Sequence, residues 1–195
     1  MDRNDTEIME SIEEILDNKE RYPGFPVGVD KDILQLSSLP IYTAFPNPFI
    51  NKFIQSYSKE YSEDNDNYNV NPLSFDITEG KNDPIYMLHS YHTKVPYKAI
   101  LKYILHYTKP GDVVFDGFAG SGMTGIAAKY CDGIDKKIVN EIESELGKME
   151  WGVRKAVLSD LSPIATFISH SLNSSQDSRV FNKEFKEIID DVINE

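Results

Sequence analysis

The stretch DVVFDGFAGSGMTGIAA, from Asp112 to Ala128, contains the pattern that decides the fold. Val113, Val114 and Phe115 form a short apolar run with β-branched residues, which predicts a buried strand. A helix-forming sequence follows, after glycines at positions 117, 120, 122 and 125. A strand, a glycine turn and a helix make up the first half of a nucleotide-binding βαβ unit, so we expect an α/β fold.

Asp116, at the end of this strand, bears on which ligand the turn can hold. The spacing of Gly120, Gly122 and Gly125 satisfies the dinucleotide fingerprint and by itself favours NAD. However, a carboxylate about 4 Å from a pyrophosphate would cost roughly 4 kcal/mol at an effective dielectric constant of about 20. The same carboxylate attracts an ammonium group, and S-adenosylmethionine carries an ammonium and a sulfonium but no phosphate. The sequence therefore favours S-adenosylmethionine as the cofactor, with a dinucleotide as the weaker alternative.

Two motifs in this part of the chain resemble those of DNA methyltransferases that modify the exocyclic amino group of adenine or cytosine. DGFAGSGMT at 116–124 resembles their motif I, usually Asp-Pro-Phe-x-Gly-Ser-Gly-Thr-Thr, with Gly117 and Met123 as departures. HSYHTKVP at 89–96 resembles motif X, usually of a His-Pro-Thr-Gln-Lys-Pro type. The resemblance covers about residues 86 to 170. It implies a partial Rossmann-like methyltransferase fold and a methyl-transfer activity that depends on S-adenosylmethionine.

The resemblance also implies a set of cofactor-binding residues. The donor would sit over Gly120 to Gly122 with its ammonium group near Asp116, and the set on this turn comprises Asp116, Phe118, Ala119, Gly120, Ser121, Gly122 and Thr124. From motif X, we expect Thr93, Lys94 and Pro96 to line the methionine end of the pocket, although the Lys94 side chain could instead project into solvent.

A second strand is expected over residues 155–159, with Asp160 at its end. An acidic residue there accepts hydrogen bonds from ribose hydroxyls in βαβ cofactor folds, but Asp160 could also serve only to cap the next helix. Leu161 and Ser162 would border the adenine and the ribose. The spacing from Gly122 exceeds the usual figure of about 20 residues because a charged insertion lies between Cys131 and Arg154.

The chain lacks the motif with which this family holds its target base. That motif has the form Asp/Asn/Ser-Pro-Pro-aromatic and stacks on a base flipped out of the helix, but no Pro-Pro pair occurs here. The nearest stretches, Asp83-Pro84-Ile85-Tyr86 and Asn47-Pro48-Phe49, are incomplete and predict a turn and a helix start. His89 and His92 lack a neighbouring acid or cysteine to complete a metal site. We therefore expect no catalytic residue and no metal in this chain.

The domain organisation follows from these motifs. Residues 81–195 are expected to form an S-adenosylmethionine-binding α/β segment, truncated before the catalytic motif. Within it we expect an extended segment over 83–95 and helices from Pro96, from Ser162-Pro163 and over 182–193. Residues 1–80 are expected to form an acidic arm, with a helix over 5–20, an extended stretch over 22–48, a helix over 48–60 and a loop over 61–72.

The net charge of −12 makes the chain a poor nucleic-acid binder by itself. We therefore expect DNA, or RNA as a variant, to be held through parts outside this chain, either the rest of the methyltransferase or a partner subunit. A non-catalytic cofactor-binding or scaffold module is the alternative to an enzyme segment. A single cysteine favours a reducing cytoplasm, and no apolar run reaches the length of about 20 residues that a membrane span needs.

Overall fold

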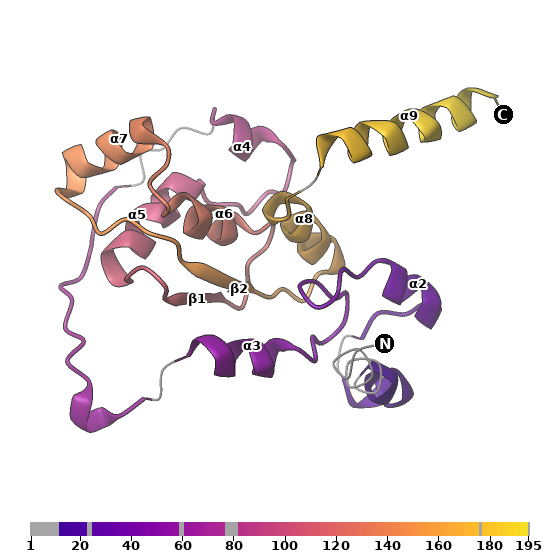
Figure 1. Ribbon diagram of the computed structural model, residues 1–195, viewed down its shortest axis with the longest axis horizontal. Coiled ribbons are helices and arrows are strands. Elements are labelled where there is room, and N and C mark those ends of the chain that lie inside the picture. Colours follow the sequence, from indigo (N-terminus) through magenta and orange to yellow (C-terminus); the bar gives the residue numbers. More distant parts are fainter. Residues whose placement is uncertain (1–11, 23–24, 59–60, 77–81, 176, 195) are drawn as a thin grey trace.

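The computed structural model describes residues 12–22, 25–58, 61–76, 82–175 and 177–194 (Figure 1). Residues 12–17 are helical. The elements that follow are η1 (Lys19–Arg21), α2 (Asp30–Gln35), α3 (Ile50–Tyr57), η2 (Glu63–Asn65), α4 (Pro84–Met87), α5 (Tyr97–Tyr107), β1 (Val113–Asp116), α6 (Met123–Tyr130), α7 (Lys136–Leu146), β2 (Lys155–Leu158), α8 (Pro163–Asn173) and α9 (Ser178–Asn194).

The two strands pair in parallel, with Val113 opposite Lys155 and Asp116 opposite Leu158. A parallel pair needs a long crossover, which α6 and α7 provide. This register brings the carboxyl ends of both strands to the same edge of the sheet. The predicted strands are confirmed, and the chain has a helix-rich α/β arrangement around this small sheet.

Helices α5 and α6 cover one face of the strands, and α3 lies on the opposite side (Figure 1). The main core joins α5, α6 and α7 through these buried residues: Tyr97, Leu101, Ile104, Leu105, Met123, Ile126, Ala127, Ala128, Cys131, Ile138 and Ile142. Their spacing of three or four residues along each helix places one apolar stripe against the next. The core therefore fixes α6, the helix that the glycine turn begins, against its neighbours.

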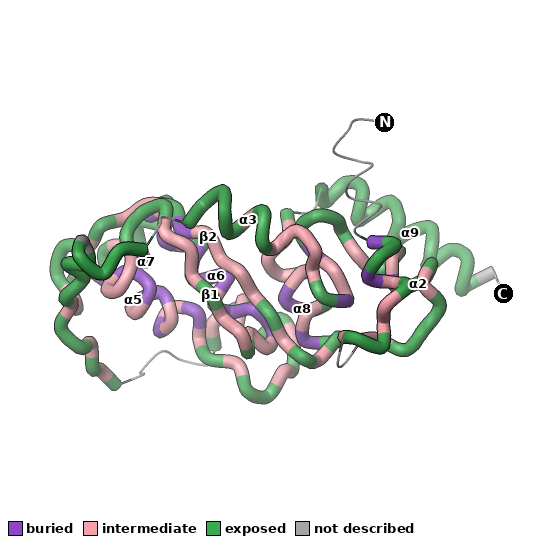
Figure 2. Tube along the Cα trace, turned by 90° about the horizontal axis from the view of Figure 1, so that it is seen from below, coloured by how far each residue is buried: buried purple, intermediate pink, exposed green. Residues whose placement is uncertain are grey.

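The prediction that the first strand is buried is wrong for Phe115, which is 71% exposed. Alternate residues of a strand face opposite sides of a sheet, and α3 covers its side of this sheet only in part. On that side, Lys155 Nζ lies 4.1 Å from the centre of the Tyr57 ring of α3, but Phe115 remains uncovered. Figure 2 shows the corresponding run of exposed and half-buried chain along β1 and β2.

Besides the contact of α3 with β2, residues before position 80 pack against the rest of the chain at two other places. Tyr42 stacks on His170 of α8 with 4.5 Å between ring centres. At the other end of the molecule, Tyr68 Oη donates to the Tyr107 carbonyl oxygen of α5 at 3.0 Å. The arm also has an apolar cluster of its own, in which Tyr22, Phe25 and Leu34 pack against the buried residues Ile15, Ile33 and Phe45. The boundary at residue 80 stays a prediction.

Four expectations about helices need correction. The segment 83–95 is not wholly extended, because Asp83 Oδ1 accepts from the Ile85 N–H at 2.9 Å and caps α4. The arm at 22–48 contains α2, and Pro96 is the N-cap of α5 rather than its first residue. The C-terminal helix is longer than expected and extends away from the body in Figure 1, with its apolar side chains exposed. The expected helix over 5–20 is described only over 12–17, and residues 5–11 lie outside the described residues.

In the part of the chain that the structure describes, no helix has the length and apolarity that a membrane crossing requires.

Close packing of α6 on α8 depends on Gly125. A Cβ atom at this position would lie 2.4 Å from Asn173 Oδ1 and 2.7 Å from Leu158 Cδ1. Asn173 has little freedom to move away, because its Nδ2 donates to the Gly122 carbonyl oxygen at 3.0 Å and to the Ser169 carbonyl oxygen at 2.9 Å. The glycine therefore allows α8 to hold the start of α6.

We expect Gly125→Ala to lower the free energy of unfolding by about 1–3 kcal/mol, because the added methyl overpacks the contact. This reverses the usual gain of about 1 kcal/mol for replacing a helical glycine with alanine. Denaturant unfolding followed by circular dichroism measures the change. Gly28→Ala is the control, since its Cβ would lie an ordinary 3.7 Å from Ile33 Cγ1. Equal or greater stability of the Gly125 variant would contradict this packing.

Candidate functional site

The candidate site lies at the carboxyl ends of β1 and β2, which is where open α/β sheets bind their ligands. The turn over residues 117–122 connects β1 to α6. It is attached to the end of β2, because the Ala119 N–H donates to the Ser159 carbonyl oxygen at 3.0 Å. Gly120 and Gly122 have φ values of +52° and +82°, a backbone conformation that favours glycine. The turn is thus a close-packed loop with little side-chain bulk.

Asp116 lies across the inside of this turn. Its Oδ1 accepts from the Phe118 N–H at 3.1 Å, and its Oδ2 accepts from Thr124 Oγ1 at 2.6 Å. These bonds connect the end of β1 to the first turn of α6 and fix the orientation of the carboxylate. Three residues of the predicted cofactor set therefore lie together, because Phe118 and Thr124 both donate to Asp116.

Asp160 joins the end of β2 to the same turn. Its Oδ2 accepts from the Gly120 N–H at 2.8 Å, and its Oδ1 accepts from the Ser162 N–H at 2.9 Å. The N-cap of α8 is Ser162, whose Oγ accepts from the Ala165 N–H at 3.4 Å. Asp160 thus braces the turn, and each ionised carboxylate oxygen retains a second lone pair for a ligand.

Two large apolar side chains flank the turn. Phe118, after β1, and Leu161, after β2, are each 86% exposed. Both belong to the predicted cofactor set. Isolated exposed apolar residues are ordinary, but these two follow the strand ends whose carboxylates accept hydrogen bonds from the turn. Exposed apolar side chains of this kind can pack against a flat aromatic ring of a ligand.

The segment with motif X approaches the turn through Tyr91, which the sequence prediction missed. A Cβ atom on Gly120 would lie 3.1 Å from Tyr91 Cε1, so the ring rests against the glycine. Only the three-dimensional structure reveals this approach, since the sequence separates the two residues by the whole of α5.

The residues predicted in motif X have other neighbours. Lys94 is half-buried rather than directed into solvent: its Nζ donates to the His89 carbonyl oxygen and lies 4.6 Å from the centre of the Tyr86 ring. Burial lowers the pKa of Lys94. Thr93 is exposed, and Pro96 is half-buried at the start of α5. The contribution of these three residues to a pocket stays a prediction.

Two buried polar side-chain atoms have no hydrogen-bond partner among the described residues. They are Ser121 Oγ, in the turn, and His89 Nε2, in the segment with motif X. Ser121 is only 2% exposed. The other ring nitrogen of His89, Nδ1, accepts from the Tyr91 N–H at 3.2 Å. Both unpartnered atoms therefore belong to the segments that meet where Tyr91 contacts Gly120.

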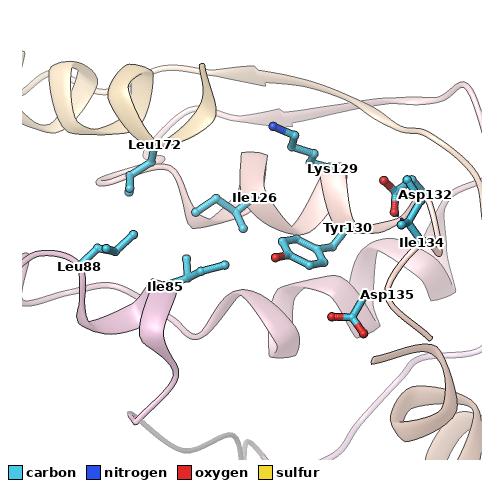
Figure 3. Close-up of a pocket in the computed structure, with 9 residues that line it drawn as sticks. All are labelled: Ile85, Leu88, Ile126, Lys129, Tyr130, Asp132, Ile134, Asp135 and Leu172. Carbon is cyan, nitrogen blue, oxygen red and sulfur yellow. Dashed lines mark hydrogen bonds between the residues drawn. The ribbon is translucent and has the colours of Figure 1, made fainter. Parts of the chain in front are cut away.

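A separate groove of about 580 Å³ lies between α4, α6 and the end of α8. Figure 3 shows Ile126 and Tyr130 of α6 facing Ile85 across it, with Asp132 and Asp135 toward one end. None of the predicted cofactor residues lines this groove. Within the described ranges, no group of three or more His, Cys, Asp or Glu side chains is arranged to hold a metal ion.

The model of the DNA methylase family, which comprises N6 and N4 methyltransferases, matches residues 30–143 of this chain. The match includes both the segment at 89–96 and the turn after β1, and it ends before β2 and Asp160. No curated protein and no solved structure matches the chain significantly. Because the matched stretch spans more than half of the sequence, the chain belongs to the family of DNA methyltransferases that act on amino groups.

Proposed function

We propose that this chain binds S-adenosylmethionine and forms the cofactor-binding portion of an enzyme that methylates the exocyclic amino group of adenine or cytosine in DNA. The observation that carries the proposal is the pair of carboxylates, Asp116 and Asp160, that hold one glycine turn at the ends of two parallel strands. In this proposal residues 81–195 are a partial Rossmann-like unit, and residues 1–80 are an arm that packs on it.

The residues of the turn fit the chemistry of this cofactor. When bound, S-adenosylmethionine supplies a methyl group on a positively charged sulfur for direct transfer to the amino nitrogen. Asp116 would face the ammonium group, for which an oriented carboxylate is a favourable partner. Asp160 would accept from the ribose hydroxyls, and Leu161 and Ser162 would border the adenine and ribose. The hydroxyl of Ser121, which has no partner among the described residues, adds a hydrogen-bonding group at the same turn.

The hydrogen bonds of the turn also argue against a dinucleotide. Dinucleotide sites bind pyrophosphate with free backbone N–H groups of the glycine turn and the helix start. Here the N–H groups of Phe118 and Gly120 donate to Asp116 and Asp160. A phosphate would therefore meet two carboxylates where it needs donors.

The target base would be held by another polypeptide segment, either the rest of the enzyme or a partner subunit. The chain has no Pro-Pro pair, and its net charge of −12 opposes extensive phosphate contacts. The same two observations favour a second candidate function, a non-catalytic cofactor-binding module of a methyltransferase complex. An RNA substrate is a variant of the first proposal. We also propose that the protein is located in the cytoplasm, because its sequence has a single cysteine.

Asp116→Asn should weaken S-adenosylmethionine binding about tenfold or more, a change of about 1.4 kcal/mol, because the charge opposite the ammonium is lost. Asparagine keeps an acceptor for the turn, so the fold should remain. Isothermal titration calorimetry gives the Kd. Asp112→Asn is a matched control at the opposite end of β1, where Oδ2 accepts from the Lys109 N–H at 2.8 Å, and its Kd should not change. An unchanged Kd in the Asp116 variant would exclude the assigned pocket.

Calorimetry of the unmodified chain should detect binding of S-adenosylmethionine and of its demethylated product, S-adenosylhomocysteine, but no binding of NAD at the same concentrations. The physical reason is the charge of the two carboxylates beside the turn. Binding of NAD in preference to both methyl-donor ligands would contradict the proposal.

A further inference from the structure

The C-terminal helix α9 has a large exposed apolar face. The helix extends away from the body of the molecule in Figure 1, and its hydrophobic side chains recur three or four residues apart. This spacing places them on one side of the helix, where each is between 41% and 75% exposed: Phe181, Phe185, Ile188, Ile189, Val192 and Ile193. A helix of this length that is rich in β-branched and aromatic residues is only marginally stable in water unless its apolar face is packed. Such a face indicates a surface that binds another polypeptide.

The second exposed apolar surface is the groove of about 580 Å³ between α4, α6 and the end of α8. Figure 3 places Leu88 and Leu172 at one end of this groove and Ile134, Asp132 and Asp135 at the other. Leu88 is 64% exposed and Ile134 is 78% exposed. A hydrophobic groove of this kind binds an amphipathic helix through apolar residues that are spaced three or four apart. The groove and α9 are therefore complementary kinds of surface.

The charges of α9 indicate the direction in which it would lie in the groove. Its basic side chains all belong to its first half, and three of its four acidic side chains belong to its second half: Arg179, Lys183 and Lys186, then Glu187, Asp190 and Asp191. This distribution is the reverse of the one that the helix dipole favours. Carboxylates beside the first half would compensate for both the basic side chains and the dipole. The groove supplies two, Asp132 and Asp135, and Lys129 is the other charged residue that lines it.

The same charges favour a second copy of the chain over the helix's own groove. Leu172 lies in the last turn of α8, and only residues 174–177 separate α8 from α9. If α9 folded directly back into its own groove, its first half would stay near Leu172, and its acidic half would meet Asp132 and Asp135. The helix of a second copy can enter the groove in the opposite direction, with its basic half beside the two carboxylates.

We propose that α9 of one copy binds in the groove of a second copy, with Lys183 toward Asp132 and Asp135, and that the exchange is reciprocal. A two-fold symmetric dimer uses each surface twice, so that both helices and both grooves become covered. This interface is separate from the glycine turn, because none of the predicted cofactor residues lines the groove. Dimerisation can therefore be tested independently of cofactor binding.

Sedimentation velocity of the full chain at several concentrations measures dimerisation. The unmodified chain should be a dimer at about 100 μM, and Phe185→Asp and Ile134→Asp should each raise the dimer Kd at least about tenfold, because each introduces a charge into the apolar contact. Both side chains are exposed in a single copy, so the core of the fold should not change. Val27→Asp is the matched control, since Val27 is fully exposed in the arm, and its dimer Kd should not change.

Charge reversal tests the direction of the helix and the exchange between copies. Asp132→Lys and Lys183→Glu should each raise the dimer Kd about tenfold or more, because like charges then face each other at both contacts of the dimer. In an equimolar mixture of the two variants, an introduced lysine faces an introduced glutamate at one contact, and the native pair remains at the other. The mixture should therefore dimerise with about the Kd of the unmodified chain.

Three results would overturn the inference. The first is an unmodified chain that stays monomeric at the same concentration. The second is a dimer that Phe185→Asp weakens and Ile134→Asp does not, since α9 would then bind a surface other than the groove. The third is a mixture of the two charge variants that dimerises no better than either variant alone. Failure of the unmodified chain to bind S-adenosylmethionine would overturn the proposed function and leave this inference in place.

Discussion

The attachment of one glycine turn to two strand ends is the constraint on which the rest of this structure depends. The bond from the Gly120 N–H to Asp160 and the bond from Thr124 to Asp116 connect β1, β2 and α6 at one point. Each bond has an ionised acceptor, which makes it stronger than a bond between neutral groups. The positions of the two carboxylates therefore follow from the same contacts that hold the sheet edge together.

Helix packing supports this arrangement from the other side of the turn. The absence of a side chain at Gly122 and Gly125 lets α8 approach until Asn173 bonds directly to the Gly122 carbonyl oxygen. The pairing of α5 with α6 through their apolar stripes then holds the motif X segment, which precedes α5, near the turn. The glycines and the core packing thus both fix the position of the turn, where the donors and the carboxylates of the candidate site lie.

The sequence predicted the local elements of this site well. The apolar run before Asp116 and the glycine spacing after it predicted β1, the turn and α6, and proline and serine at 162–163 predicted the start of α8. These signals are local, because strand propensity, positive φ and capping depend on near neighbours. The resemblance of the two motifs likewise identified the family that the comparison found.

Features that depend on tertiary contacts could not be predicted in the same way. Phe115 was expected to be buried, but its exposure depends on how far α3 covers its side of the sheet. The contact of Tyr91 with Gly120 and the bracing of the turn by Asp160 join residues that are distant in the chain. That His89 Nε2 has no partner among the described residues likewise could not be read from the sequence. The candidate cofactor-binding residues were thus predicted as a set, while the contacts among them needed the structure.

A crystal structure of the chain with S-adenosylhomocysteine bound tests the central claim most directly. The account predicts the ammonium group within hydrogen-bonding distance, about 3 Å, of Asp116, and the ribose hydroxyls directed toward Asp160. A ligand bound instead in the groove lined by Ile85, Ile126 and Tyr130, with the glycine turn left free, would contradict it.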